Sequence, residues 1–205
     1  MYFKYGEEEI EYLKSRDEKL SKVIEKIGHI NRKVDKDLFS ALVHHIVGQQ
    51  ISTKAQETIW QRINNELKVI NPESIQKAGI DKLQSLGVSS RKAEYIMDFA
   101  NKVKSGEFDI GSVSEKSDDD AIAELVKLKG VGVWTAEMLL LFCLGRKNVL
   151  SFDDLGIQRG LKILYHHRKI TKTLFAKYRR RFSPYCSVAS LYLWEVSKYE
   201  NSLCL

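Results

Sequence analysis

Two adjacent aspartates, Asp153 and Asp154, are the residues of this 205-residue chain best suited to catalysis. They stand directly before Leu155, where a helical pattern begins. A carboxylate at a helix N-terminus can stabilise positive charge that develops at a reacting carbon, and it can orient an attacking water. Aspartate is also a favoured N-cap residue, so capping the following helix is the alternative explanation for Asp154. The two roles are compatible.

A tight turn, Gly130-Val131-Gly132, lies upstream between two helical patterns. The first pattern covers 118–127, with Ser117 as its N-cap and aspartates in its first turn, where the helix dipole favours negative charge. The second covers about 133–144 and is apolar on nearly every face, as is typical of a buried helix. Glycine permits such a turn because it has no Cβ. The amides that open the second helix can hold an anion, for which a nucleic-acid phosphate is the obvious candidate.

These motifs, in this order, resemble the helix-hairpin-helix DNA glycosylases of the HhH-GPD superfamily. The segments Val43–Ser52 and Leu191–Trp194 are similar to parts of the branch that removes alkylated bases, the 3-methyladenine DNA glycosylase II type. The likeness covers roughly residues 8–200. It implies an enzyme of base excision repair that flips out alkylated purines, such as 3-methyladenine and 7-methylguanine, from duplex DNA.

By the family pattern the second acid, Asp154, is the catalytic residue. It would stabilise the oxocarbenium-like state that forms when an N-glycosidic bond breaks. Lyase-type relatives carry a lysine two residues after the second hairpin glycine, and that amine forms a Schiff base with the sugar. This chain has Trp134 there. We therefore expect a monofunctional glycosylase that uses water and leaves an abasic site.

Four residues are expected around the extruded base: Trp134, Glu137, Met138 and Trp194. An indole attracts a cationic alkylated base by ~0.5–2 kcal/mol. Met138 follows Trp134 by one turn and faces the same side, and Glu137 can accept a hydrogen bond from a flipped base. Core packing is the alternative for both tryptophans, and the helix dipole alone accounts for Glu137.

The resemblance also indicates how DNA is held. Gln50 lies in the break between two helices and is assigned the wedge that fills the gap left by the flipped nucleotide, whereas Gln49 is expected to be structural. Bonding to exposed backbone ends is the alternative for both. The following helix is expected to start at Ser52 or Thr53, and Thr53 with Gln56 fits a capping box. The expected DNA-binding residues are Gln50, Lys129, Gly130, Gly132 and Thr135. A monovalent cation, Na⁺ or K⁺, is expected on the hairpin carbonyls of Leu128 and Val131.

Composition agrees with a nucleic-acid partner, since the formal net charge is +6. Basic residues gather in 166–181, although a solvated helical face explains such a run equally well. The three cysteines, Cys143, Cys186 and Cys204, lack the spacing for a disulfide framework, a zinc site or the iron–sulfur cluster of some relatives. No apolar run is long enough to span a bilayer, and the N-terminus is acidic. We expect a cytoplasmic monomer, nucleoid-associated in a prokaryote.

Only two prolines interrupt the helical patterns, and no long strand pattern appears, which predicts an all-α fold. We expect one glycosylase domain of two helical lobes, a central lobe of about 37–144 and a terminal lobe of 1–36 plus 145–205. The hairpin motif occupies 118–144, and the substrate should enter between the lobes. Two alternatives remain: a glycosylase of the same fold for an oxidised or deaminated base, and a non-catalytic DNA-binding protein that keeps the hairpin.

Overall fold

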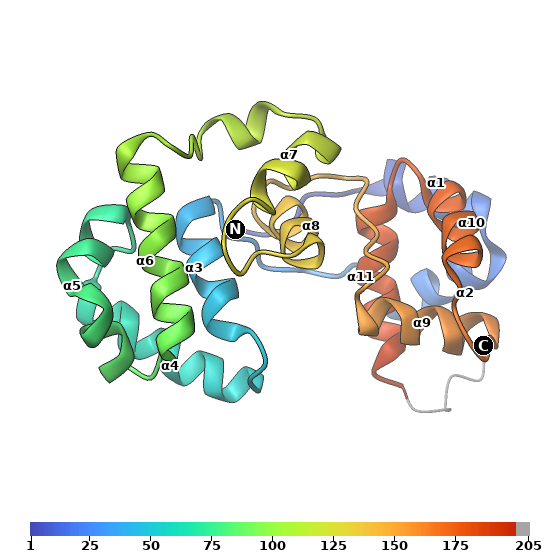
Figure 1. Ribbon diagram of the computed structural model, residues 1–205. Helices are drawn as coiled ribbons and strands as arrows, with labels where there is room; N and C mark the ends of the chain where they lie inside the picture. The colour runs from blue at the N-terminus through green and yellow to red at the C-terminus, as the bar shows by residue number, and fades with distance from the viewer. Residues whose placement is uncertain (200–205) are drawn as a thin grey trace. The chain divides into compact units, whose positions relative to one another are not determined.

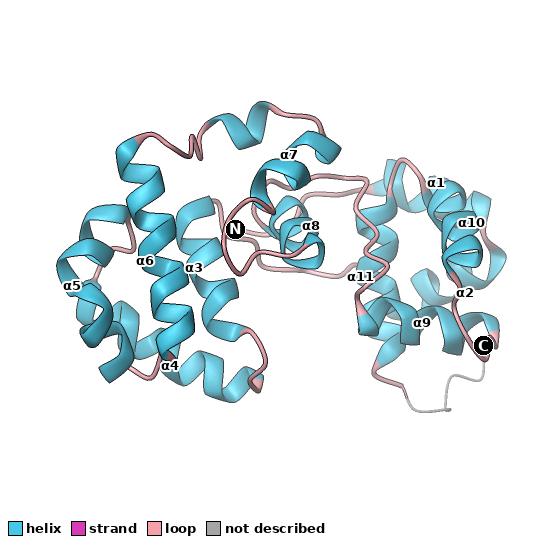
Figure 2. Cartoon of the chain, viewed as in Figure 1, coloured by secondary structure: helices cyan, strands magenta, loops and turns pink. Residues whose placement is uncertain are grey.

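The computed structural model describes residues 1–199, which form α-helices joined by loops (Figures 1 and 2). In this range the only strand-like pairing is an isolated antiparallel bridge between Tyr2 and Lys33. The all-α fold expected from the sequence is confirmed. The chain divides into two compact units, one made of Met1–Val34 with the chain from Leu140 onward, and the other of Asp35–Leu139.

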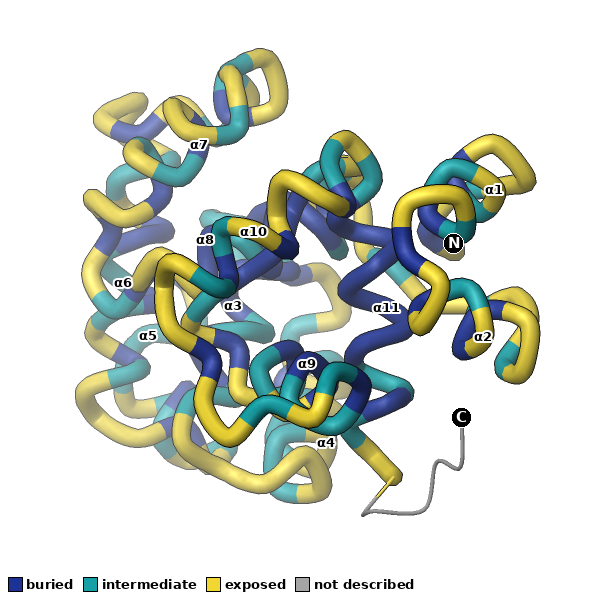
Figure 3. The backbone as a smooth tube through the Cα atoms, turned by 90° about the vertical axis from the view of Figure 1, so that its right-hand side faces the viewer, coloured by how far each residue is buried: buried dark blue, intermediate teal, exposed yellow. Residues whose placement is uncertain are grey.

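The first unit is built around a buried C-terminal helix, α11, which is buried along most of its length (Figure 3). A Cβ on Gly160 of α9 would stand 2.2 Å from the carbonyl oxygen of Leu193, so α9 and α11 pack too closely there for any residue but glycine. The Tyr192 hydroxyl donates to the Gly28 carbonyl at 3.0 Å and ties α11 to the end of α2. The helices of this unit are α1 (Glu7–Arg16), α2 (Glu18–Ile27), α9 (Leu155–Tyr165), α10 (Lys172–Phe182) and α11 (Cys186–Ser197).

The second unit holds α3 (Leu38–Gly48), α4 (Thr53–Leu67), α5 (Pro72–Ser85), α6 (Ser90–Ser105), the short 3-10 helix η1 (Ser112–Glu115) and α7 (Asp118–Leu125). Its core includes Phe39 stacked on Phe99 with ring centroids 4.7 Å apart. Gly79 adopts a φ of +77° and kinks α5. The helix α8 (Val133–Phe142) contains the point in the chain where one unit ends, at Leu139, and the other resumes, at Leu140.

Polar side chains begin several helices, with Asp17, Asp37 and Ser117 each accepting a backbone N–H of the first turn. The cap at Ser117 is the one expected from the sequence. The cap of α4 is Ser52, one of the two expected starts, and its hydroxyl accepts the Ala55 N–H at 3.3 Å. Gln56 donates to the His44 carbonyl at 3.0 Å. The capping box expected from Thr53 and Gln56 is therefore wrong, because the glutamine side chain reaches the neighbouring helix.

Among residues 1–199, no helix combines the length and the apolar character needed to cross a bilayer. Cys143 and Cys186 are buried free thiols, and burial raises the pKa of the Cys186 thiol to about 12. The third cysteine, Cys204, lies outside the described residues.

Candidate functional site

Asp154 is the N-cap of α9 and is nearly buried, with 7% of its surface exposed. Its Oδ1 accepts the backbone N–H of Ile157 at 2.8 Å and the indole Nε1–H of Trp194 at 2.9 Å. Two donors from different helices therefore fix the carboxylate at the N-terminal end of α9, where the helix dipole favours a negative charge. Asp153, the other acid of the pair, is exposed.

Trp194 packs against Phe142 and against the backbone at Gly156. Its ring stacks on Phe142, with centroids 5.4 Å apart, and the Arg32 guanidinium lies 4.7 Å from the Phe142 ring centroid. A Cβ on Gly156 would stand 2.7 Å from the Trp194 Cδ1 and 3.1 Å from the Asp154 Oδ1. The indole therefore lies directly against the first turn of α9, which is why a glycine follows Leu155.

The hairpin turn, which we define as Lys129–Gly132, has the geometry expected from its glycines. Gly130 adopts a φ of +80°, and a Cβ there would stand 2.3 Å from the Tyr95 Cδ2. Gly132 is exposed, and among the described residues no heavy atom lies within 4 Å of the place of its Cβ. The Gly132 carbonyl accepts the Ala136 N–H at 3.0 Å, so the positive end of α8 opens at this exposed glycine.

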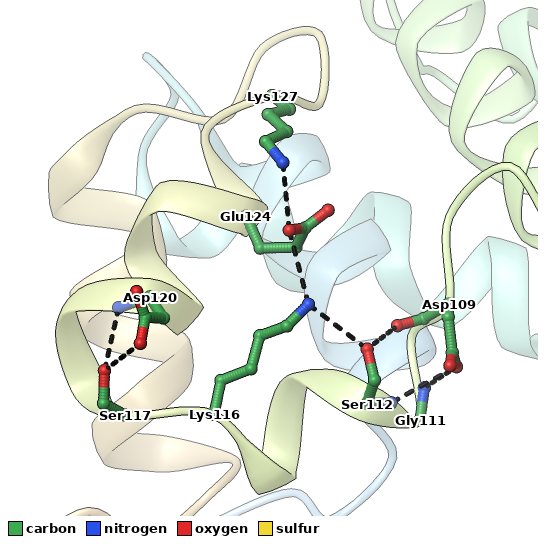
Figure 4. A network of polar contacts seen from close by, with 8 residues as sticks. All are labelled: Asp109, Gly111, Ser112, Lys116, Ser117, Asp120, Glu124 and Lys127. Carbon is green, nitrogen blue, oxygen red and sulfur yellow. Dashed lines mark hydrogen bonds and ion pairs between the residues drawn. The ribbon is translucent and has the colours of Figure 1, made fainter.

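A network of polar contacts supports α7, the first helix of the motif (Figure 4). Glu124 on α7 accepts hydrogen bonds from Lys116 at 3.3 Å and from Lys127 at 3.0 Å. The bond from Lys127 is the main reason that the pKa of Glu124 lies below its usual value. Ser117 caps the helix by accepting the Asp120 N–H at 3.2 Å. These contacts fix the position of α7 and with it the start of the turn.

The two glutamines before α4 have different surroundings. Gln49 donates from Nε2 to the Gly130 carbonyl at 2.7 Å, so it is structural, as expected. Gln50 is exposed and adopts a φ of +55°, a conformation rare for residues other than glycine. The Lys92 ammonium donates to the carbonyls of Val47 and Gln49 at 2.9 and 2.6 Å. The residue assigned as wedge is thus an exposed side chain on an anchored turn.

Of the expected base-pocket residues, Trp194 lies in the first unit beside Asp154, and Trp134, Glu137 and Met138 lie in the second. Trp134 is 39% exposed, Glu137 is half-buried and Met138 is buried. The Trp134 ring meets the edge of His45 with centroids 6.4 Å apart. Burial lowers the pKa of His45 to about 4, so its imidazole is neutral near pH 7.

The residues expected to contact DNA also differ in how far they are exposed. Lys129 pairs with Asp98 at 2.8 Å and remains largely exposed. Thr135 is buried, with 4% of its surface exposed, so little of this residue is accessible to DNA. The Leu128 carbonyl accepts the Val131 N–H at 3.1 Å, which leaves the second lone pair of that oxygen for another partner.

The basic residues of the stretch 166–181 differ in their contacts. Arg181 pairs with buried Asp17, and Arg179 donates to the Leu150 carbonyl at 3.4 Å, so both support the first unit from within. Lys177 and Arg180 line a shallow hollow of about 280 Å³ together with Ser15, Arg16 and Arg181. Arg179 and Arg181 therefore have a structural role that neither explanation of the stretch included, and a phosphate contact by the other basic residues stays a prediction.

Sequence reasoning missed Lys92, His45, Phe142 and Arg32. Lys92 donates to the carbonyls of Val47 and Gln49, and His45 contacts the Trp134 ring, so both contact residues that are distant in the chain. No local sequence pattern indicates such contacts. Phe142 lies in an apolar helix, so the sequence predicted only that it packs in the core. In the sequence, the glycine at position 156 was the indication that a bulky side chain, here Trp194, packs against the first turn of α9.

The chain is similar to known proteins over most of its length. Residues 43–184 match the family described as HhH-GPD superfamily base excision DNA repair protein. DNA-3-methyladenine glycosylase 1 of Schizosaccharomyces pombe is 31% identical, over 91% of this chain and 86% of that protein.

Solved structures are also similar. A DNA-3-methyladenine glycosidase from Bacillus halodurans has a TM-score of 0.85 and 35% identity, and the match covers 96% of this chain and 92% of that one. The Schizosaccharomyces pombe 3-methyladenine DNA glycosylase in complex with abasic DNA has a TM-score of 0.84 and 28% identity, covering 95% and 98%. This chain belongs to the HhH-GPD superfamily of base excision DNA repair proteins.

Proposed function

We propose that this chain is a monofunctional DNA glycosylase that excises alkylated purines from duplex DNA by hydrolysis and leaves an abasic site. The observation that carries the proposal is the Asp154 carboxylate, fixed by Ile157 and Trp194 at the start of α9. The relatives named DNA-3-methyladenine glycosylase support the substrate class.

In the proposed reaction the bond between the sugar C1′ and the purine nitrogen breaks, and positive charge builds on the sugar. The Asp154 carboxylate stabilises that charge and orients the water that attacks C1′. Its two hydrogen bonds hold it in place before the charge forms, so no reorganisation is needed during the reaction. The cationic alkylated base leaves as a neutral molecule with the bonding electron pair. The water oxygen takes its place on the sugar, and the proton that the water loses passes to the Asp154 carboxylate and then to solvent.

Trp134 accounts for two properties of the proposed enzyme. It stands where a lyase needs an amine, so the covalent route through a Schiff base is closed. Its exposed indole can also attract a base that alkylation has made cationic. The neutral imidazole of His45 beside it adds no opposing positive charge.

The hairpin turn would bind a DNA phosphate through the backbone at Gly130, Gly132 and Thr135, with Lys129 nearby and a Na⁺ or K⁺ ion held by the carbonyls of Leu128 and Val131. Gln50 would fill the gap in the duplex. Because phosphate contacts carry no base information, binding should be largely independent of sequence and sensitive to salt.

The test is release of 7-methylguanine from a duplex by the wild type, Asp154→Asn and the matched control Asp153→Asn, which alters the exposed neighbouring acid. Wild type and control should leave sites that break only in hot alkali, and Asp154→Asn should leave almost none. Strand breaks without alkali would indicate a lyase. Tight DNA binding without base release would favour a neutral lesion or a binding protein, which a panel of damaged bases separates.

A further inference from the structure

The wedge turn, which we define as Gln49–Gln50, and the hairpin turn are joined by a side-chain hydrogen bond within the second unit. Gln49 Nε2 donates directly to the Gly130 carbonyl at 2.7 Å, although the two residues are 81 positions apart in the chain. A shift of either turn would therefore strain this hydrogen bond and displace the other turn.

One helix, α6, supports both turns. From its first turn Lys92 donates to the Val47 and Gln49 carbonyls, at 2.9 and 2.6 Å. One and two turns further along, the Tyr95 ring packs on Gly130 and Asp98 pairs with Lys129 at 2.8 Å. These three side chains follow one another at intervals of three residues, so they lie along one side of α6.

Lys92 is suited to this role by its charge and its burial. It is half-buried at the C-terminal end of α3, where backbone carbonyls lack helical partners and the dipole favours a cation. The carbonyl of Gln49 immediately precedes Gln50, whose φ of +55° costs conformational energy. A strained backbone conformation of this kind persists only where surrounding contacts stabilise it. The two hydrogen bonds from Lys92 are such contacts.

We propose that Lys92 and Gln49 are positioning residues that fix Gln50 relative to the hairpin turn, so that wedge insertion and phosphate docking occur as one event. This inference rests on the proposed function for its substrate, duplex DNA. It predicts that Lys92 matters most when a paired base must be displaced.

The first experiment compares Lys92→Met with Lys104→Met, which removes the same charge from an exposed position on the same helix. Base release is measured on 7-methylguanine opposite cytosine and opposite an abasic site, where the base has no partner to leave. Lys92→Met should lower kcat/KM about tenfold on the paired duplex, with a clearly smaller loss on the unpaired one. Lys104→Met should behave as the wild type. Equal losses on both substrates would overturn the inference, because they would indicate a general loss of folded protein.

The second experiment asks whether Lys92 acts through Gln50. In a Gln50→Ala background, Lys92→Met should lower kcat/KM by less than about twofold further, because the side chain that it positions is already gone. Losses that simply multiply would contradict the proposal.

A third readout does not depend on catalysis. In a duplex with 2-aminopurine beside the lesion, fluorescence rises when the wedge unstacks the base. The wild type and Lys104→Met should give this rise on binding, and Lys92→Met should give a weaker one at saturating protein. The same rise in all three would reject the inference. A rise that needs Lys92 without any base release would keep it and reject the proposed glycosylase activity.

Discussion

The indole of Trp194 donates a hydrogen bond of 2.9 Å to the Oδ1 of Asp154, the same oxygen that accepts the Ile157 N–H. The backbone bond alone would describe an ordinary helix cap. The indole adds a second direction and fixes the plane of the carboxylate from another helix. An oriented carboxylate needs no rearrangement when positive charge appears beside it, which distinguishes a catalytic acid from a cap.

Trp194→Phe should slow base release while leaving the fold intact. Phenylalanine keeps the stacking on Phe142 but loses the donor to Asp154. Hydrogen bonds to charged groups contribute about 1.5–3 kcal/mol, so a tenfold or somewhat larger fall in the single-turnover rate is expected, smaller than that of Asp154→Asn. Trp60→Phe, in the second unit beside His44, is the control and should keep most of the rate. An unchanged rate for Trp194→Phe would show that the indole does not orient the acid.

Gly156→Ala should separate activity from stability. Its Cβ would stand 2.7 Å from the Trp194 ring and would displace the indole. Alanine gains about 1 kcal/mol over glycine in a helix, which offsets much of the ~1–3 kcal/mol cost of overpacking. Urea unfolding should therefore change little while the rate falls.

The control for this change is Gly6→Ala, because among the described residues no heavy atom lies within 4 Å of the place of that Cβ. The combined Gly156→Ala and Trp194→Phe variant should lose little more activity than either change alone, since both break the same contact. Fully multiplied losses would mean that Gly156 acts through something other than the indole.

The parts of the fold that could be predicted from the sequence are those set by local rules. Ser117 and Asp154 were each expected to begin a helix, and each accepts a first-turn N–H. Such caps depend on residues two or three positions apart. Gln56 shows the limit, since its local match to a capping box gave way to a bond with His44 on the previous helix.

The site was harder to predict because its contacts are distant in the chain. Trp194 and Asp154 are 40 residues apart, and Lys92 lies 43 residues from the carbonyl of Gln49. A lysine in an amphipathic helix has the same appearance in sequence whether it points to solvent or to a helix end. Residue type and position indicated the pair Asp153 and Asp154, and the resemblance to a known family singled out Asp154 and Gln50. The residues that position them required the structure.

Stability should depend on pH through His45. Burial holds the pKa of His45 at about 4 in the folded protein, against 6.5 as its ordinary value, with a smaller contribution from His44. Between these values the unfolded chain binds a proton that the folded protein does not. The free energy of unfolding therefore falls as pH drops from about 6.5 to about 4, by up to about 3 kcal/mol, and this contribution levels off below.

His45→Gln should make that decline shallower, as measured by urea unfolding at pH 7, 5.5 and 4.5. It should not abolish the decline, because burial also lowers the pKa of His44. His29→Gln is the control, since His29 is exposed and stacks on Tyr5 at the surface. A decline as steep in His45→Gln as in the wild type would mean that His45 takes up its proton in the folded state.

The two hairpin glycines should differ in the effect of a change to alanine, with Gly130→Ala lowering stability and Gly132→Ala leaving it nearly unchanged. Gly130→Ala places a methyl group against the Tyr95 ring in a backbone with a φ of +80°, so unfolding should become easier by about 2 kcal/mol or more. Gly132 has open space and no positive φ, so Gly132→Ala should keep its stability within about 0.5 kcal/mol.

Gly132→Ala should nevertheless bind duplex DNA more weakly, because the added methyl group occupies the exposed entrance of α8 where a phosphate would approach the helix end. Anisotropy titrations at several salt concentrations test this, with thermal melting of the same samples. If the phosphate contact is lost, the slope of log K against log salt becomes shallower. Unchanged affinity and slope in Gly132→Ala would place the phosphate elsewhere, and the hairpin would then serve only to pack α7 against α8.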